Sequence, residues 1–300
     1  MSSKILVVGS INMDLITVLD RCTKVGETLL GQSFTTALGG KGSNQAVAAA
    51  RLGASVAMIG AVGDDANGSA ALQTLQQEGV DTSGIAIKNG VSTGIASITV
   101  AESDNHIIVV SGANFELSLA DIDAHEALFA GVDVVLCQLE IPMDCVLHAA
   151  QLARKYQATF VLNPAPAQQL SAELMALVDV MTPNHTELKQ AFGLLDDASD
   201  SDIAHILPAH MQLVMTEGAN GASHYSKAGK RHWPAFQVQA VDTTGAGDTF
   251  NAGLAVQWPQ GLDVAVQHAQ AAAALAVQAV GAQTAMPTAA AVGMFIQQHS

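Results

Sequence analysis

A run bracketed by two aspartates, Asp242-Thr-Thr-Gly-Ala-Gly-Asp248, precedes an apolar stretch (252–258) that predicts a helix. Its glycines permit a tight turn and close approach of the backbone to a ligand. The first N–H groups of a helix have no intrahelical partner and carry partial positive charge, so they attract phosphate oxygens. We therefore predict that the amides of Gly245, Ala246 and Gly247 form an anion hole for a transferring phosphoryl group.

Asp248 falls in the first turn of that predicted helix, where a carboxylate can accept the proton of an attacking hydroxyl. Positioning and charge stabilisation are most of what phosphoryl transfer requires. Asp is also favoured near helix N-termini, so a simple helix cap explains a bare Gly-x-Gly-Asp pattern equally well. The longer run, with an aspartate at each end, is rarer by chance and favours Asp248 as a catalytic base.

Two familiar nucleotide-binding fingerprints are missing from the sequence. A Walker A loop needs Ser or Thr after Gly-Lys, but Gly40-Lys41 and Gly229-Lys230 are followed by Gly and Arg. A dinucleotide fingerprint needs Gly-x-Gly-x-x-Gly after the first strand, and residues 9–14 read Gly-Ser-Ile-Asn-Met-Asp. The sequence therefore disfavours a P-loop enzyme and an NAD-dependent oxidoreductase.

Polar residues follow the ends of several predicted strands. Asn12 and Asp14 follow the apolar run 5–8, and Glu140 follows the run 132–137. Ligands of open α/β sheets bind at the carboxyl ends of strands, and amide and carboxylate groups can hydrogen-bond adjacent hydroxyls. For Asn12 and Asp14 taken alone, an ordinary Asn/Asp turn is the better explanation.

The segment Gly39-Gly-Lys-Gly-Ser-Asn44 precedes an Ala-rich stretch (43–52) that predicts a helix. Its glycines allow close approach to a ligand, so Lys41 and Asn44 are candidates for binding sugar hydroxyls. The alternative is a flexible loop with a solvated lysine.

Two further segments admit a structural and a functional interpretation. Asn184-His-Thr-Glu187 has the spacing of a capping box, and it also offers an amide and a carboxylate near Mg²⁺-bound phosphates. Thr216-Glu-Gly-Ala-Asn-Gly221 follows the predicted strand 213–215. This segment predicts a turn into a hairpin. Because it lies at the carboxyl end of a strand, it is also a candidate for contact with a nucleotide.

Strand and helix patterns alternate along most of the chain and predict a mostly parallel sheet with right-handed crossovers. The segments 11–38 and 91–112 read as β-structure without helices. We expect them to combine into a small sheet that acts as a lid over a cleft. The predicted elements outside these segments are strands at 5–8, 55–59, 132–137, 159–162, 178–181 and 213–215, and helices at 43–52, 66–78, 143–156, 171–176, 184–192, 199–206 and 271–279.

Composition limits the function classes. The 300 residues are 49% hydrophobic and carry a net charge of −15, so we expect a large core and no nucleic-acid partner. Three unevenly spaced cysteines indicate a reducing compartment. The sequence shows no leader pattern and no apolar stretch of the roughly 20 residues that cross a bilayer. We therefore expect a cytoplasmic protein without a membrane partner.

Several motifs in this order resemble the ribokinase family of sugar kinases over nearly the whole chain. The first family signature is similar to Gly39–Asn44 and the second to Asp242–Asp248. Further matching motifs are Gly26-Glu-Thr28, Gly79-Val-Asp-Thr82, Ser111-Gly-Ala-Asn114 and Gly281-Ala-Gln283.

The resemblance implies one three-layer α/β kinase domain over 1–300, with a mostly parallel central sheet and a small β-sheet lid. It implies ATP, Mg²⁺ and K⁺ as ligands, and often a homodimer formed through the lid. It assigns Asp248 as base and Gly245, Ala246 and Gly247 as the anion hole. The remaining implied roles are sugar binding by Asn12, Asp14, Gly40, Lys41, Asn44 and Glu140; nucleotide binding by Asn184, Thr216, Gly218, Gly221, Gly247 and Gln270; Mg²⁺ near Glu187; and K⁺ at Asp242, Thr244, Ala276, Ala279, Gly281 and Ala285.

The sequence departs from the family pattern at a few of these positions. Ala285 replaces a frequent Ser, and Gln270 stands where His or Asn is expected near the adenine. Ribose is the expected substrate, phosphorylated on its 5-hydroxyl. The alternatives are kinases of 2-deoxyribose, fructose or adenosine, and a sugar-binding regulator without catalysis.

Overall fold

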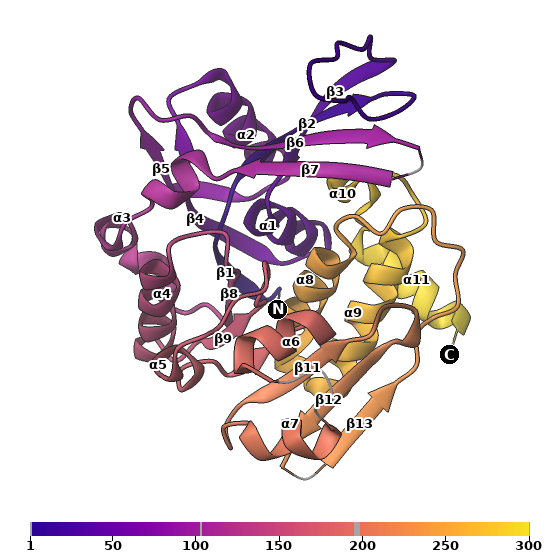
Figure 1. The fold of residues 1–300 in the computed structure, drawn as a ribbon. Helices are drawn as coiled ribbons and strands as arrows, with labels where there is room; N and C mark the ends of the chain where they lie inside the picture. Colours follow the sequence, from indigo (N-terminus) through magenta and orange to yellow (C-terminus); the bar gives the residue numbers. More distant parts are fainter. Residues whose placement is uncertain (1, 103, 195–198, 228, 300) are drawn as a thin grey trace.

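The architecture is known from a computed structural model that describes residues 2–102, 104–194, 199–227 and 229–299. Positions 1, 103, 195–198, 228 and 300 lie outside the described residues, although the predicted 1–300 domain includes them all and the predicted piece 91–112 includes Ser103. The predicted α/β class is confirmed: a large, mostly parallel sheet lies between two layers of helices, and a small sheet stands beside it (Figure 1).

The large sheet has nine strands among the described residues, in the order β13-β12-β11-β10-β9-β8-β1-β4-β5. All neighbouring pairs are parallel except β11 with β12 and β12 with β13, which form antiparallel hairpins. The strands are β1 Lys4–Val8, β4 Ser55–Gly63, β5 Asp81–Lys88, β8 Val134–Cys137, β9 Thr159–Leu162, β10 Val180–Met181, β11 Gln212–Thr216, β12 Ala222–Ser226 and β13 Gly229–Trp233.

Helices cover both faces of this sheet. The first layer contains α1, α2, α8, α9 and α11, and the second contains α3 to α7 (Figure 1). The helices are α1 Lys41–Arg51, α2 Ala66–Gln77, α3 Leu119–Ala124, α4 Met143–Lys155, α5 Ala172–Met175, α6 His185–Phe192, α7 Asp200–Ile206, α8 Ala246–Gln257, α9 Leu262–Ala276, α10 Ala282–Ala285 and α11 Ala289–His299.

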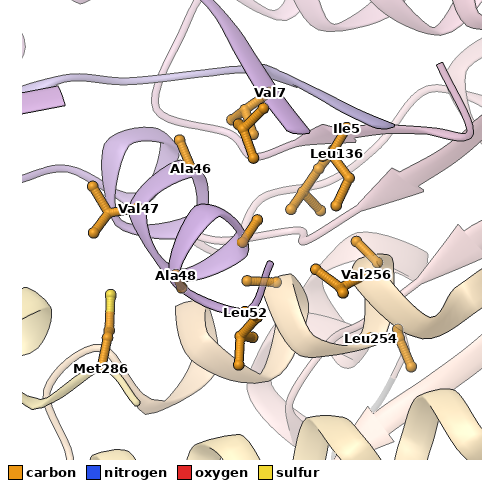
Figure 2. Close-up of a cluster of buried hydrophobic side chains, with 14 of the residues drawn as sticks. Ile5, Val7, Ala46, Val47, Ala48, Leu52, Leu136, Leu254, Val256 and Met286 are labelled. Atoms are coloured by element: carbon orange, nitrogen blue, oxygen red, sulfur yellow. The ribbon is translucent and has the colours of Figure 1, made fainter. Parts of the chain in front are cut away.

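Successive side chains of a strand point to opposite faces, so the buried strands supply two separate cores. In β1, Ile5 and Val7 pack in the first layer, whereas Leu6 and Val8 pack in the second. Figure 2 shows the first core, where Ile5 and Val7 lie near the alanines of α1. These small side chains let α1 pack closely against β1 and α8, which places its N-terminus beside the start of α8.

The small sheet combines strands from two separate parts of the chain, in the order β3-β2-β6-β7. The pair β2 and β6 is parallel, and the outer pairs are antiparallel. The first residues of β2 and β6, Asn12 and Gly94, lie side by side with the last residue of β3, Gly39. The strands are β2 Asn12–Val18, β3 Ser33–Gly39, β6 Gly94–Ala101 and β7 Asp104–Val110.

Over the described residues, every helix is too short or too polar to pass through a lipid bilayer.

Candidate active site

The start of α8 has the features of an anion site. Gly245 caps the helix with φ of +73°, a left-handed conformation that favours glycine, and a Cβ there would lie 3.0 Å from Ala282. The amide of Ala246 donates to the carbonyl of Thr243 at 3.2 Å. Among the described residues, none accepts a hydrogen bond from the amides of Gly245 or Gly247. Two of the three predicted donors are therefore free, and Ala246 is engaged in the turn.

Asp248 lies one residue beyond these amides and is 8% exposed. Its Oδ2 accepts from Asn44 Nδ2 at 3.0 Å, and its Oδ1 accepts from Gln45 Nε2 at 3.0 Å. Burial raises the pKa of the Asp248 carboxyl, while the charge of Lys41 and the two amide donors oppose that rise. A buried carboxylate with an elevated pKa is a better proton acceptor than an exposed one.

The N-terminus of α1 brings Lys41 and Asn44 to the same place. Gly40 precedes the helix with φ of +91° and carries no capping side chain. Glu140, from the loop after β8, supplies the missing acceptor: its Oε2 accepts from the amide of Lys41 at 3.0 Å and from Ser10 Oγ at 2.5 Å. The predicted sugar ligand Glu140 therefore also holds the helix start in position.

Asn12 and Asp14 lie in β2, beside β3. The Asp14 carboxylate lies against Gly39, where a Cβ would come within 2.2 Å of it. Burial, Glu140 and Asp248 together raise the pKa of Asp14 to about 6. Asn12 is buried, and its Oδ1 accepts from Asn114 Nδ2 at 2.7 Å. The structure thus places Asp14 near enough to the predicted base for their charges to interact, and it places Asn12 beside Gly40.

Two adjoining cavities meet at Gly247. The smaller, about 230 Å³, borders Asp248, Lys41 and Glu187. The larger, about 320 Å³, is mostly apolar and is lined by the predicted nucleotide residues Thr216, Gly218, Gly221, Gly247 and Gln270 together with residues of the 235–240 segment. Gln270 is fixed there because its Nε2 donates to the carbonyl of Trp233 at 2.9 Å. The larger cavity suits the nucleobase and ribose moiety of a nucleotide, and the smaller one suits its phosphates.

Asn184 and Glu187 form the capping box that the spacing predicted. Asn184 Oδ1 accepts from the amide of Glu187 at 2.9 Å, and Glu187 Oε2 accepts from the amide of Asn184 at 2.9 Å. Both residues also border the smaller cavity. Burial raises the pKa of Glu187, and the nearby Asp248 adds to the rise. The structural and functional interpretations are therefore compatible.

The predicted monovalent-cation residues lie on two segments that touch: the loop before α8, and the segment from the end of α9 to the end of α10. Asp242 Oδ1 accepts from the amide and the hydroxyl of Thr244, and its Oδ2 accepts from the amide of Gly281 at 2.8 Å. The amides of residues 241 and 242 donate to the carbonyl of Val277. Asp242 therefore clamps the loop before α8 to the loop after α9. Ala276, Ala279, Gly281 and Ala285 all fall on the α9 to α10 segment.

Several residues at the site were not predicted from the sequence. Ser10 links Glu140 to α1, Asn114 holds Asn12, and Gln45 binds Asp248 directly. Gln45 directly follows the Gly-rich segment 39–44, and Asn114 ends the family motif 111–114, so the sequence around both residues pointed to the site. Ser10 had none beyond its place after the first strand.

Comparisons with known proteins show the family of this chain. Residues 2–289 match the model of the pfkB family carbohydrate kinases. The ribokinase of Haemophilus influenzae is 45% identical over 295 residues, covering 96% of this chain and 96% of that protein. The ribokinase of Bacillus subtilis is 43% identical over 287 residues, covering 95% of this chain and 96% of that protein.

A solved structure, Arabidopsis thaliana ribokinase complexed with ribose and ATP, has the same fold. It superposes with a TM-score of 0.90 at 29% identity, covering 99% of each chain. Family match, full-length relatives and a shared fold all point the same way, and the chain belongs to the pfkB family of carbohydrate kinases.

Proposed function

We propose that this protein phosphorylates the 5-hydroxyl of D-ribose with ATP, giving ribose 5-phosphate and ADP. The observation that carries the proposal is the position of Asp248, a buried carboxylate beside the free amides that begin α8. Two relatives named ribokinase at 43–45% identity and a structural neighbour with ribose and ATP support ribose as the acceptor.

The reaction needs a base, an anion site and a sugar held in line. Asp248 accepts the proton of the 5-hydroxyl, whose oxygen forms a bond to the γ-phosphorus of ATP. The bond from that phosphorus to the bridging oxygen breaks, and ADP leaves with the electron pair. The free amides of Gly245 and Gly247 stabilise the charge on the transferring group.

The sugar is held by groups on three elements: Asn12 and Asp14 on β2, Gly40, Lys41 and Asn44 at α1, and Glu140 after β8. Glu140 keeps Oε1 available, since its contacts to Ser10 and Lys41 use Oε2.

Mg²⁺ would be held near Glu187, whose Oε1 remains available beside the cavity that holds Asp248. When bound, it would neutralise charge on the ATP phosphates. A monovalent cation such as K⁺ would lie between the loops that Asp242 clamps, with backbone carbonyls as ligands. Both donor sets are oxygen, which suits these hard cations.

The small sheet is proposed as a lid and as the surface of a homodimer in the cytoplasm. Its outer strands expose Phe34, Ile107 and Ile108, which are 62%, 54% and 68% exposed. Exposed apolar side chains gathered on one sheet are typical of an interface. Sedimentation velocity would test the dimer, and Phe34→Ser with Ile108→Ser is expected to yield monomers.

One panel of acceptors tests the activity. We expect rapid ADP release with ribose and slower release with 2-deoxyribose, fructose and adenosine. Each rate is measured once with K⁺ and once with tetramethylammonium as the monovalent cation. Equal rates with both cations would refute the cation site. Sugar binding without ADP release from any acceptor would instead support a non-catalytic sugar-binding regulator.

The pKa of Asp14 predicts a pH-dependent affinity for ribose. With a pKa of about 6, this carboxylate is ionised above that pH and loses its negative charge below it. We expect the ribose Kd, measured calorimetrically without ATP, to be constant above about pH 7 and to rise by at most about tenfold per pH unit below 6. Asp14→Asn should weaken binding and remove this inflection.

Lowering the pH should weaken the affinity for ribose but stabilise the fold. A raised folded pKa stabilises the protein below the unfolded value of 3.8, and that contribution is lost as the pH rises through 6. Asp14→Asn should therefore unfold at a higher Tm than the wild type at pH 8. If the curve of ribose Kd against pH keeps its inflection near pH 6 in Asp14→Asn, the titrating group is not Asp14.

A further inference from the structure

Gln45 binds the proposed base and is fully buried. Its Nε2 donates both to Asp248 Oδ1 at 3.0 Å and to Asn163 Oδ1 at 3.1 Å. Its Oε1 accepts from Gln138 Nε2 at 2.6 Å. All hydrogen-bonding atoms of this amide therefore have partners, and each partner is itself a buried side chain. A polar side chain placed in a core with every bond satisfied rigidifies its surroundings.

The bonds continue from Gln45 to the other half of the site. Asn163 Nδ2 donates to the carbonyl of Thr182 at 3.3 Å, and the hydroxyl of Thr182 donates to Asn251 Oδ1. Asn251 Nδ2 then donates to the carbonyl of Gly247 at 2.8 Å. Gly247 precedes Asp248 in the chain, so these hydrogen bonds close a ring. It runs from the base Asp248 through Gln45, Asn163, Thr182 and Asn251 to the carbonyl of Gly247, the residue whose N–H faces the anion site.

This ring has one consistent orientation of its amides. Turning the Gln45 amide over would place its oxygen against the carboxylate of Asp248 and against Asn163 Oδ1. Such contacts leave buried donors and acceptors unpaired, which costs far more than a normal hydrogen bond contributes. The ionised carboxylate therefore fixes the direction of the ring.

We propose that Gln45 is a positioning residue for the phosphoryl transfer, which holds Asp248 in place and couples it through the hydrogen-bonded ring to the carbonyl of Gly247. The proposal rests on the proposed function, because it takes Asp248 as the base. Each carboxylate oxygen has two lone pairs, so one bond from Gln45 and one from Asn44 leave room for the sugar hydroxyl.

A second consequence concerns ionisation. Burial raises the pKa of Asp248, and the hydrogen bond from Gln45 lowers it. The charged groups near this carboxylate come from four places. Lys41 on α1 lowers the pKa of Asp248 and Glu140 after β8 raises it. Asp14 on β2 and Glu187 on α6 also interact with its charge. Without Gln45, the desolvated carboxylate should hold its proton to a higher pH.

The test compares two buried glutamines of equal length. Gln45→Met removes a donor from Asp248, whereas Gln138→Met removes a donor from Gln45 and leaves both contacts to Asp248 in place. The measurement is kcat/KM for ribose against pH, together with thermal unfolding. The acid limb is the part of this curve where kcat/KM falls as the pH is lowered. In Gln45→Met we expect the midpoint of the acid limb to move to a higher pH by about one unit. In Gln138→Met we expect lower stability and an unmoved limb.

Gln45→Glu is a second variant of the same shape. Its carboxylate keeps the bond from Gln138 and repels Asp248, so the acid limb should move upward further than in Gln45→Met. The titration of ¹³C-labelled Asp carboxyls by NMR, with the Asp248 signal assigned by its loss in Asp248→Asn, measures the same shift without turnover.

The outcomes separate this inference from the proposed function. Acid limbs and Asp248 titrations that match the wild type in Gln45→Met and Gln45→Glu would overturn the positioning role. An equal shift in Gln138→Met would also overturn it, because the effect would then follow loss of packing. If Asp248→Asn keeps normal turnover, the base assignment itself fails, whatever the Gln45 variants do.

Discussion

Replacing Asp248 by Asn should lower kcat by about 10²- to 10⁴-fold, because the amide cannot take the proton of the sugar hydroxyl. The KM for ATP should change little, since the cavity lined by the predicted nucleotide residues does not include Asp248. At pH 8 two effects on stability oppose each other. The new NH₂ group faces the NH₂ group of Gln45 or of Asn44, which lowers stability, and the loss of a buried charge raises it. The buried carboxyl has a raised pKa, so its stabilising contribution is present at low pH and is lost as the pH rises through that pKa.

A matched control separates catalysis from helix capping. Asp202 occupies the third position of α7, as Asp248 does in α8, and it completes a capping box with Ser199. Asp202→Asn should lose a little stability and no activity. Near-normal kcat in Asp248→Asn, measured by ADP release under saturating substrates, would leave Asp248 with a structural role alone.

The parallel sheet could be predicted because its strands are short apolar runs separated by helical patterns. The strand 159–162 matches β9, and the helix 66–78 ends within one residue of α2. The edge strand β5 was not predicted. Residues 81–88 mix polar and small residues around a glycine, and they pair on one side only, with β4. An edge strand has a neighbour on one side only, and β5 is accordingly less buried than β1, so its apolar pattern is weak.

The small sheet was predicted from its two pieces, but the first piece was predicted as β-structure from 11 to 38 without a break. Residues 19–32 form no strand, and β3 begins at Ser33. The reason is the length of β2, which ends at Val18 opposite Ser33, so that residues 28–32 have no strand beside them. Strand length depends on the partner strand as well as on local propensity.

The site was predicted best where a motif is continuous in sequence. The run 242–248 and the segment 39–44 meet in the structure through the bond between Asn44 and Asp248. The hydrogen-bonded ring could not be predicted, because its side chains come from separate parts of the chain: Gln45 from α1, Asn163 and Thr182 from the residues after β9 and β10, and Asn251 from α8. Asn and Gln are ordinary residues in a sequence, and only burial shows that every one of their bonds must be satisfied.

Gly247→Ala should lower kcat/KM by about 10²-fold while leaving the fold intact or slightly more stable. A Cβ at Gly247 would meet no protein atom within 4 Å, and the backbone there has no left-handed φ. Every Cβ of an α-helix tilts toward the N-terminus, which is the end where the phosphoryl group would bind. The methyl group would therefore occupy the space between the two cavities that Gly247 borders.

The expected loss is comparable to the removal of one oxyanion-hole donor, about 10²- to 10³-fold, because the phosphoryl oxygens can no longer approach the amide. Gly293→Ala is the matched control: it lies in α11, its Cβ would also meet nothing, and it borders neither cavity. Both variants should gain up to about 1 kcal/mol in the free energy of unfolding, measured by urea denaturation. Only Gly247→Ala should lose activity, and equal kinetics for the two variants would show that phosphoryl transfer does not use the start of α8.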